Sequence, residues 1–139
     1  MKCLGLDLGT KRLGLSMSDK LGIISYPYKL ISFKEYIDAA KEVARIVEKE
    51  KIELVVLGLP KNMDNSLGFA SQRSIEFKKM LEELISVDII LIDERLSTVE
   101  AENILISNDM KRNKRKKVID ELSACIILDT YLRTVGNNE

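Results

Sequence analysis

The chain has 139 residues, 45% of them hydrophobic and 32% charged, which is the composition of one ordinary domain with a sizeable core. It contains no run of about 18 apolar residues and no apolar leader segment, so we expect a cytoplasmic protein with no membrane span. Histidine is absent, so any hydrolytic chemistry must rest on carboxylates, Lys, Tyr, Ser or a cation bound by oxygen.

The first third of the chain has the alternating pattern of strands. Two segments, Lys2–Leu8 and Leu13–Ser18, are predicted strands joined by a tight turn. After a second turn at Ser18–Gly22, a third strand is expected within Ile23–Ile31. We expect it to be interrupted near Pro27, because proline cannot donate a hydrogen bond to a sheet.

The hydrophobic pattern then changes to the period of a helix. A capping box at Ser32–Glu35 predicts where this helix begins. The next segment, Glu53–Gly58, is short and almost continuously apolar, which is typical of a buried parallel strand. The apolar face of the helix consists of Ile37, Ala40, Val43, Ala44 and Val47.

The second half continues with helices and one more strand. A helix is predicted from Phe69 to Ile85, and Val87–Ile92 is a buried strand. A second capping box at Ser97–Glu100 opens a helix to about Asn108, and the final helix spans Val118–Thr134. This order of elements predicts a single α/β domain over residues 1–139, with one mixed sheet and helices on both of its faces.

Asp7 interrupts the first apolar strand, where burying an unpaired carboxylate is costly. A bound cation would offset that cost; the alternative is a core aspartate held by backbone N–H groups of the following turn. Asp93 and Glu94 end the last strand and point to opposite faces, and Asp120 begins the last helix. Each of these acids alone could be a surface or helix-capping residue. Together, with no histidine in the chain, they form an oxygen-ligand set suited to Mg²⁺ or Mn²⁺.

A basic segment, Lys111–Lys117, holds six of the 22 basic residues of the chain. Mutual repulsion predicts an extended, mobile loop that leads into a helix starting near Val118. A solvated loop is one interpretation. Because cations at a helix N-terminus oppose the helix dipole, an anionic partner such as a nucleic-acid backbone is the other. The candidate phosphate contacts are Lys111, Arg112, Lys114, Arg115, Lys116 and Lys117.

Four spaced segments, Asp7–Gly14, Gly58–Asp64, Asp93–Thr98 and Lys117–Ala124, resemble the motifs of one family. In the same order, they are similar to motifs of the YqgF/RuvX family of Holliday-junction-resolvase-like nucleases, and the match spans almost the whole chain. The resemblance implies an RNase H-like fold, with a five-stranded mixed sheet of three antiparallel strands followed by two parallel strands.

The resemblance also implies roles for particular residues. Asp93 is the substitute metal ligand if the strand register is shifted by one residue, and the acids would hold Mg²⁺ or Mn²⁺, in a site for two ions. The basic segment would hold the nucleic-acid backbone away from the cut. The implied catalytic carboxylates and metal ligands are Asp7, Glu94 and Asp120. The implied phosphate contacts near them are Lys11, Arg12 and Arg95.

Other functions share single features with the chain. The Asp-Leu-Gly-Thr segment also resembles a phosphate loop of actin-like sugar kinases and chaperone ATPases, but those enzymes need a second lobe that this length excludes. An aspartyl phosphatase would have a second Asp at the position of Gly9. A non-catalytic factor that binds nucleic acid or acts in transcription, with the same fold, stays open.

The substrate is not fixed by the sequence. The resemblance implies processing of the 5′ end of pre-16S ribosomal RNA or, as the alternative, cutting of DNA four-way junctions. No residue separates RNA from DNA. The absence of a strong dimer seam predicts a monomer or a weak homodimer.

Overall fold

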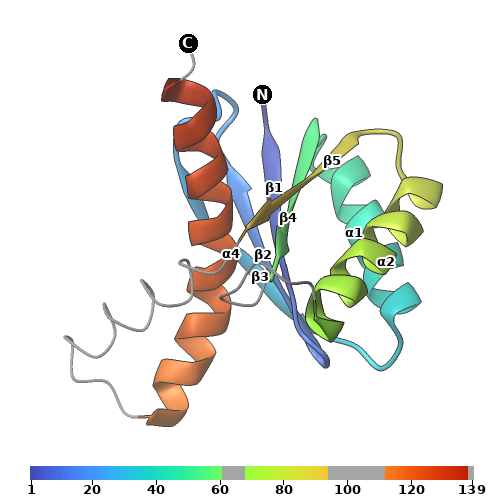
Figure 1. The fold of residues 1–139 in the computed structure, drawn as a ribbon. Helices are drawn as coiled ribbons and strands as arrows, with labels where there is room; N and C mark the ends of the chain where they lie inside the picture. Colours follow the sequence, from blue (N-terminus) through green and yellow to red (C-terminus); the bar gives the residue numbers. More distant parts are fainter. Residues whose placement is uncertain (61–67, 94–111, 138–139) are drawn as a thin grey trace.

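The computed structural model describes residues 1–60, 68–93 and 112–137, and within the last range the side chains from Leu122 to Thr134. Five strands form one sheet in the order β3-β2-β1-β4-β5 (Figure 1). The strands are β1 (Cys3–Leu8), β2 (Arg12–Ser18), β3 (Ser25–Ser32), β4 (Leu54–Leu59) and β5 (Asp88–Asp93). The described helices are α1 (Tyr36–Lys49), α2 (Phe69–Leu84) and α4 (Arg112–Asn137).

The sheet is mixed, as the sequence predicts. Strands β1, β2 and β3 pair antiparallel, whereas β4 pairs parallel with β1 and β5 pairs parallel with β4. The expected interruption near Pro27 is confirmed, because the β2–β3 register shifts between Leu15, which pairs with Lys29, and Ser16, which pairs with Pro27. The fold class is therefore the five-stranded mixed sheet that the sequence and the resemblance predict.

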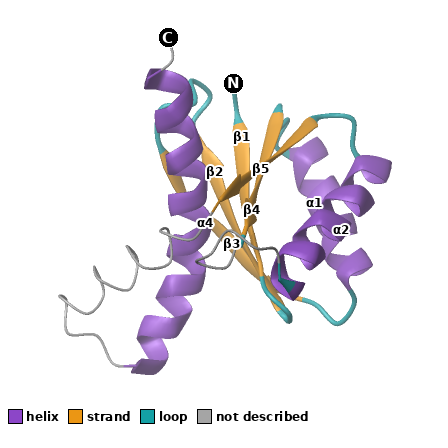
Figure 2. Cartoon of the chain, viewed as in Figure 1, coloured by secondary structure: helices purple, strands orange, loops and turns teal. Residues whose placement is uncertain are grey.

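Helices cover both faces of the sheet (Figures 1 and 2), with α4 on one face and the pair α1 and α2 on the other. We call these the α4 face and the α1/α2 face. Alternate side chains of β1 divide between them: Leu4 and Leu6 join the core cluster of α1 and α2, while Cys3 joins that of α4. Because successive side chains of a strand point to opposite faces, the position of a residue in its strand tells which face it lies on.

Helix α1 begins later than the sequence predicts, so the prediction that a capping box at Ser32–Glu35 starts this helix is wrong. Ser32 still pairs with Arg12 in the sheet, and the backbone N–H of Phe33 donates to the carbonyl of Lys11 at 3.0 Å. The strand therefore continues through the position expected to cap the helix, and Glu35 becomes an N-cap without a side-chain hydrogen bond.

The apolar face of α1 is confirmed at Ala40, Val43 and Val47, which are buried. The prediction is wrong at Ile37, which is 40% exposed, and Ala44 is half-buried. Ala39 and Ile46 of the same helix, which the prediction did not include, are buried instead. Because α1 begins at Tyr36, Ile37 lies in its first turn, near the edge of the packed interface.

The expected extended loop before Val118 is also wrong for the residues that the structure describes. Helix α4 begins at Arg112, so the basic residues from Arg112 to Lys117 lie in its first turns. Lys and Arg are good helix formers, and water and salt screen the repulsion between like charges. Lys111 and the helix expected at Ser97–Asn108 lie outside the described residues.

The two cysteines are core residues. Cys3 and Cys125 are both buried and carry free thiols, and burial raises the pKa of each thiol above its ordinary value. In the described part of the chain, no helix is both long enough and apolar enough to cross a membrane.

Candidate active site

Asp7 lies on the α4 face, near the carboxyl end of the central strand β1. Its neighbours Leu6 and Leu8 point into the α1/α2 core, so the carboxylate projects to the opposite side. The side chain is half-buried. In the neighbouring strand, Asp7 pairs with Gly14, and Gly14 pairs in turn with Leu30 of β3. Since glycine has no side chain, the sheet is hollowed between Asp7 and Leu30.

A tight turn brings two basic residues to the same place. The backbone N–H of Gly9 donates to the carbonyl of Arg12 at 2.8 Å, and a Cβ at position 9 would lie 2.9 Å from that oxygen. Only glycine therefore fits this close approach. The turn carries Lys11 at its tip and starts β2 at Arg12, which has the same parity as Gly14 and so projects to the α4 face.

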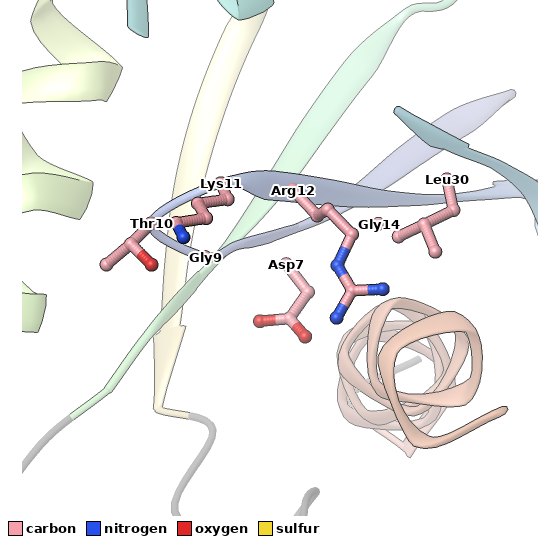
Figure 3. Close-up of a pocket in the computed structure, with 7 residues that line it drawn as sticks. All are labelled: Asp7, Gly9, Thr10, Lys11, Arg12, Gly14 and Leu30. Carbon is pink, nitrogen blue, oxygen red and sulfur yellow. The ribbon is translucent and has the colours of Figure 1, made fainter. Parts of the chain in front are cut away.

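These residues line a pocket of about 390 Å³. Figure 3 shows the carboxylate of Asp7 and the guanidinium of Arg12 extending into it from adjacent strands, on the side where α4 passes. Thr10 and Lys11 lie at the end of the hairpin. The pocket thus combines an oxygen donor with cationic groups, which is what a site for a phosphate and a metal ion requires. Its lining is Asp7, Gly9, Thr10, Lys11, Arg12, Gly14 and Leu30.

Helix α4 is held close to the sheet beside this pocket. The hydroxyl of Ser16 donates to the carbonyl of Ala124 at 2.7 Å, and that of Ser25 donates to the carbonyl of Cys125 at 3.0 Å. Ala124 is fully buried. Asp120 does not begin this helix as expected, because α4 starts at Arg112; position 120 lies within α4, one turn before Ala124.

The predicted acids do not all lie on one face. Asp93 pairs with Leu59 and lies two residues after Leu91, which packs against the α1/α2 core. Because strand side chains alternate, Asp93 belongs to the α1/α2 face, opposite to Asp7. Glu94 and Arg95 lie outside the described residues, and so does the side chain of Asp120. Among the side chains that the structure describes, no three potential ligands gather closely enough to hold a metal ion.

The chemistry of the pocket nevertheless suits a hard cation. Asp7 offers a carboxylate oxygen at the border between the apolar sheet and the pocket, and the chain has no histidine to attract softer metals. The basic segment lies in α4 at Arg112–Lys117, upstream of Asp120 in the same helix. The sequence did not reveal Gly14 and Leu30 as lining residues; the available signal is that Gly14, a residue without a side chain, lies in the strand next to that of Asp7.

Comparisons with known proteins identify the family. A family model described as RuvX, Holliday junction resolvase, matches residues 1–134. A protein of Caldanaerobacter subterraneus subsp. tengcongensis is 42% identical over 139 residues, which is 99% of this chain and 100% of that protein. A protein of Geobacillus sp. strain WCH70 is 43% identical over 134 residues, which is 95% of this chain and 97% of that protein. Both carry the name "Putative pre-16S rRNA nuclease".

Solved structures share the fold at low sequence identity. The Fowlpox virus resolvase in complex with Holliday junction DNA has a TM-score of 0.58 at 15% identity, covering 97% of this chain and 99% of the resolvase. The T. thermophilus RuvC in complex with a Holliday junction substrate has a TM-score of 0.58 at 14% identity, with 96% of each chain covered. The fold is the RNase H-like fold of these resolvases, and by its sequence this chain belongs to the RuvX family.

Proposed function

We propose that the protein is a metal-dependent nuclease that hydrolyses phosphodiester bonds at the Asp7 pocket. The observation that carries the proposal is the meeting of Asp7, Lys11 and Arg12 around one pocket at the end of the central strand. A carboxylate beside two cations can bind both a metal ion and the phosphate on which it acts. The family match and the names of the relatives support the same activity.

The metal would be Mg²⁺ or Mn²⁺, held by Asp7, Glu94 and Asp120 in a site for two ions. When bound, such ions supply an activated water and charge stabilisation at the scissile phosphate. We assign the ligand role to Glu94 and not to Asp93, because Asp93 has the parity of the opposite face. The backbone of α4 supports the assignment of Asp120, since this helix runs antiparallel to β1 and passes beside it at Ala124 (Figure 1).

The protein's own cations bind and orient the substrate. Arg12 presents a planar guanidinium to the pocket, which suits two oxygens of one phosphate, and Lys11 offers a point charge at the hairpin tip. Arg95 is a further proposed phosphate contact. Lys111 and the basic residues Arg112–Lys117 would hold the backbone away from the cut without reading its sequence.

The proposed substrate is precursor 16S ribosomal RNA, in line with the names of the relatives. A DNA four-way junction is the second candidate, because the matching family model is described as a Holliday junction resolvase. Cutting both strands of a junction symmetrically needs two active sites, and hence a dimer. We propose a monomer or a weak homodimer acting in the cytoplasm on RNA.

One experiment tests the activity and the substrate together. The purified protein and the Asp7→Asn variant are given precursor RNA and a four-way junction in parallel, each with Mg²⁺, with Mn²⁺ and with a chelator, and the native mass is measured. We expect metal-dependent cleavage of the RNA by the wild type and not by the variant. Cleavage of the junction alone, by a dimer, would favour the second candidate. Binding of nucleic acid without metal-dependent cleavage would identify a non-catalytic factor and overturn the proposal.

A further inference from the structure

Strand β1 and helix α4 touch backbone to backbone at Gly5. A Cβ built at position 5 would lie 2.8 Å from the Cβ of Leu128 and 2.9 Å from the carbonyl oxygen of Ala124, and it would also collide with the hydroxyl of Ser16. Neither the Leu128 Cβ nor the Ala124 oxygen can rotate away, because both are fixed by the helix backbone. Gly5 is therefore required by lack of space between the strand and the helix.

This contact lies on a regular path toward the Asp7 pocket. Cys3 belongs to the same core cluster as Ile127, Tyr131 and Leu132, and two residues further along β1, a Cβ at Gly5 would meet Leu128 and Ala124. Advancing along the strand thus means moving back along the helix. Two more residues of β1, about 6.6 Å, lead to Asp7, and four residues back along α4, about 6 Å, lead from Ala124 to position 120. The nearly equal steps bring the helix turn of Asp120 alongside Asp7.

We propose that Gly5 is a positioning residue, which sets the spacing between Asp7 and the turn of α4 that carries Asp120. The inference rests on the proposed function, since both acids are proposed metal ligands there. Mg²⁺ requires near-ideal coordination geometry, so a displacement of one ligand by a few tenths of an ångström weakens binding. Because glycine has no side chain, α4 can approach β1 closely enough for Asp7 and Asp120 to share a metal site.

The hydrogen bond from Ser16 is expected to contribute less to the spacing between β1 and α4 than the lack of a side chain at position 5. Removing the hydroxyl in Ser16→Ala takes away an attraction, but the helix can keep its place because its packing on Gly5 is unchanged. Gly5→Ala instead inserts an atom where the helix backbone already lies, so α4 must move outward. The steric contact, and not the hydrogen bond, is expected to control metal affinity.

The test measures the Mn²⁺ dissociation constant by calorimetry and the melting temperature by circular dichroism, with cleavage at saturating Mn²⁺ as a third readout. Gly5→Ala is the main variant, and Ala124→Ser adds an atom at a fully buried position of the same helix turn in case Gly5→Ala does not fold. Ile127→Val is the matched control, because it weakens the α4 core at a fully buried position without adding bulk.

We expect Gly5→Ala to weaken Mn²⁺ binding by about tenfold or more, in the range seen when a group that orients metal ligands is lost. Ala124→Ser should weaken it in the same direction. Ser16→Ala should stay within about threefold of the wild type, and Ile127→Val within about twofold despite a lower melting temperature. Saturating Mn²⁺ should restore most of the cleavage by Gly5→Ala.

Wild-type Mn²⁺ affinity in folded Gly5→Ala and Ala124→Ser would overturn the inference alone, and so would an equal loss of affinity in Ile127→Val. The proposed function fails separately, and the inference with it, if the wild type does not bind Mn²⁺ or if Asp7→Asn binds it equally well. A loss of Mn²⁺ affinity in Gly5→Ala that follows its melting temperature, as in the control, would also reject the positioning role.

Discussion

Strands β1 and β2 present different kinds of side chain to the two faces of the sheet. The α1/α2 face carries large aliphatic residues such as Leu4, Leu6 and Leu57, which are fully buried under two helices. On the α4 face, β4 and β5 also contribute aliphatic side chains, but β1 and β2 present Gly5, Gly14, Ser16 and Asp7. The first arrangement fills a core. The second lets one helix approach closely and leaves a hollow at the strand ends.

The difference shows how one small sheet supports stability and chemistry at once. Large side chains on one face supply most of the apolar burial, since burial free energy scales with apolar area. Small side chains on the other face would be a weakness if burial alone mattered. They are placed where α4 crosses and where the Asp7 pocket opens. Substitutions on the two faces should therefore have separable effects.

The largest effect on stability is expected at Phe77, a fully buried aromatic residue of α2 in the α1/α2 core. Phe77→Ala should lower the free energy of unfolding by about 3–5 kcal/mol, measured by urea denaturation. At temperatures well below its melting point, the folded variant should keep wild-type Mn²⁺ affinity. A loss of metal affinity equal to that of a pocket variant would mean that the two faces are not separable.

A smaller effect, on nucleic-acid binding, is expected from substituting Arg12 on the α4 face. Arg12→Ala should weaken binding of nucleic acid and reduce the slope of log Kd against log salt by about one, because one phosphate contact is lost. Fluorescence anisotropy over a salt series measures this slope. Lys20→Ala, in the turn between β2 and β3 at the other end of the hairpin, is the matched control. An unchanged slope in Arg12→Ala, or an equal change in Lys20→Ala, would contradict the phosphate role.

The smallest effect concerns the β2–β3 turn, away from both cores. The backbone N–H groups of Ile23 and Ile24 donate to Asp19 Oδ1 at 2.7 and 3.2 Å, and this holds the pKa of Asp19 below its ordinary value of 3.8. A carboxyl whose pKa is lowered by folding stabilises the folded state at pH values above its ordinary pKa. This contribution is lost as the pH falls through the lowered pKa.

The variant Asp19→Asn should therefore melt slightly below the wild type at pH 7, and the difference should shrink at pH values below the ordinary pKa of the carboxyl. Melting temperatures measured across this range test the expectation. A difference of the same size at low and at neutral pH would show that the charge of Asp19 plays no part.

Most of the fold follows from patterns in the sequence. The alternation in Lys2–Leu8 and Leu13–Ser18 and the apolar run at Glu53–Gly58 correctly predict β1, β2 and β4, because local periodicity reports burial directly. The start of α1 could not be read locally. Ser32 has the sequence of a helix cap, but its pairing with Arg12, a contact distant along the chain, keeps it in the sheet.

The candidate site could be predicted only in part. Asp7, Lys11 and Arg12 meet at one pocket as expected, since they lie within one hairpin. The roles of Gly14 and Leu30 depend on strand register, and that of Gly5 depends on how closely α4 packs, so neither is visible in a local pattern. The assignment of Glu94 and Asp120 as metal ligands stays a prediction.

The separation of the core from the proposed active site by strand β1 is tested most directly at two adjacent residues of that strand. Asp7→Asn and Leu6→Ala are compared for Mn²⁺-dependent cleavage of precursor RNA and for the free energy of unfolding. We expect Asp7→Asn to lose cleavage by about a hundredfold or more, since it removes a proposed ligand itself, with little loss of stability. Leu6→Ala should lose about 2–5 kcal/mol of stability, while its folded fraction still cuts. Undiminished cleavage by Asp7→Asn would contradict the account.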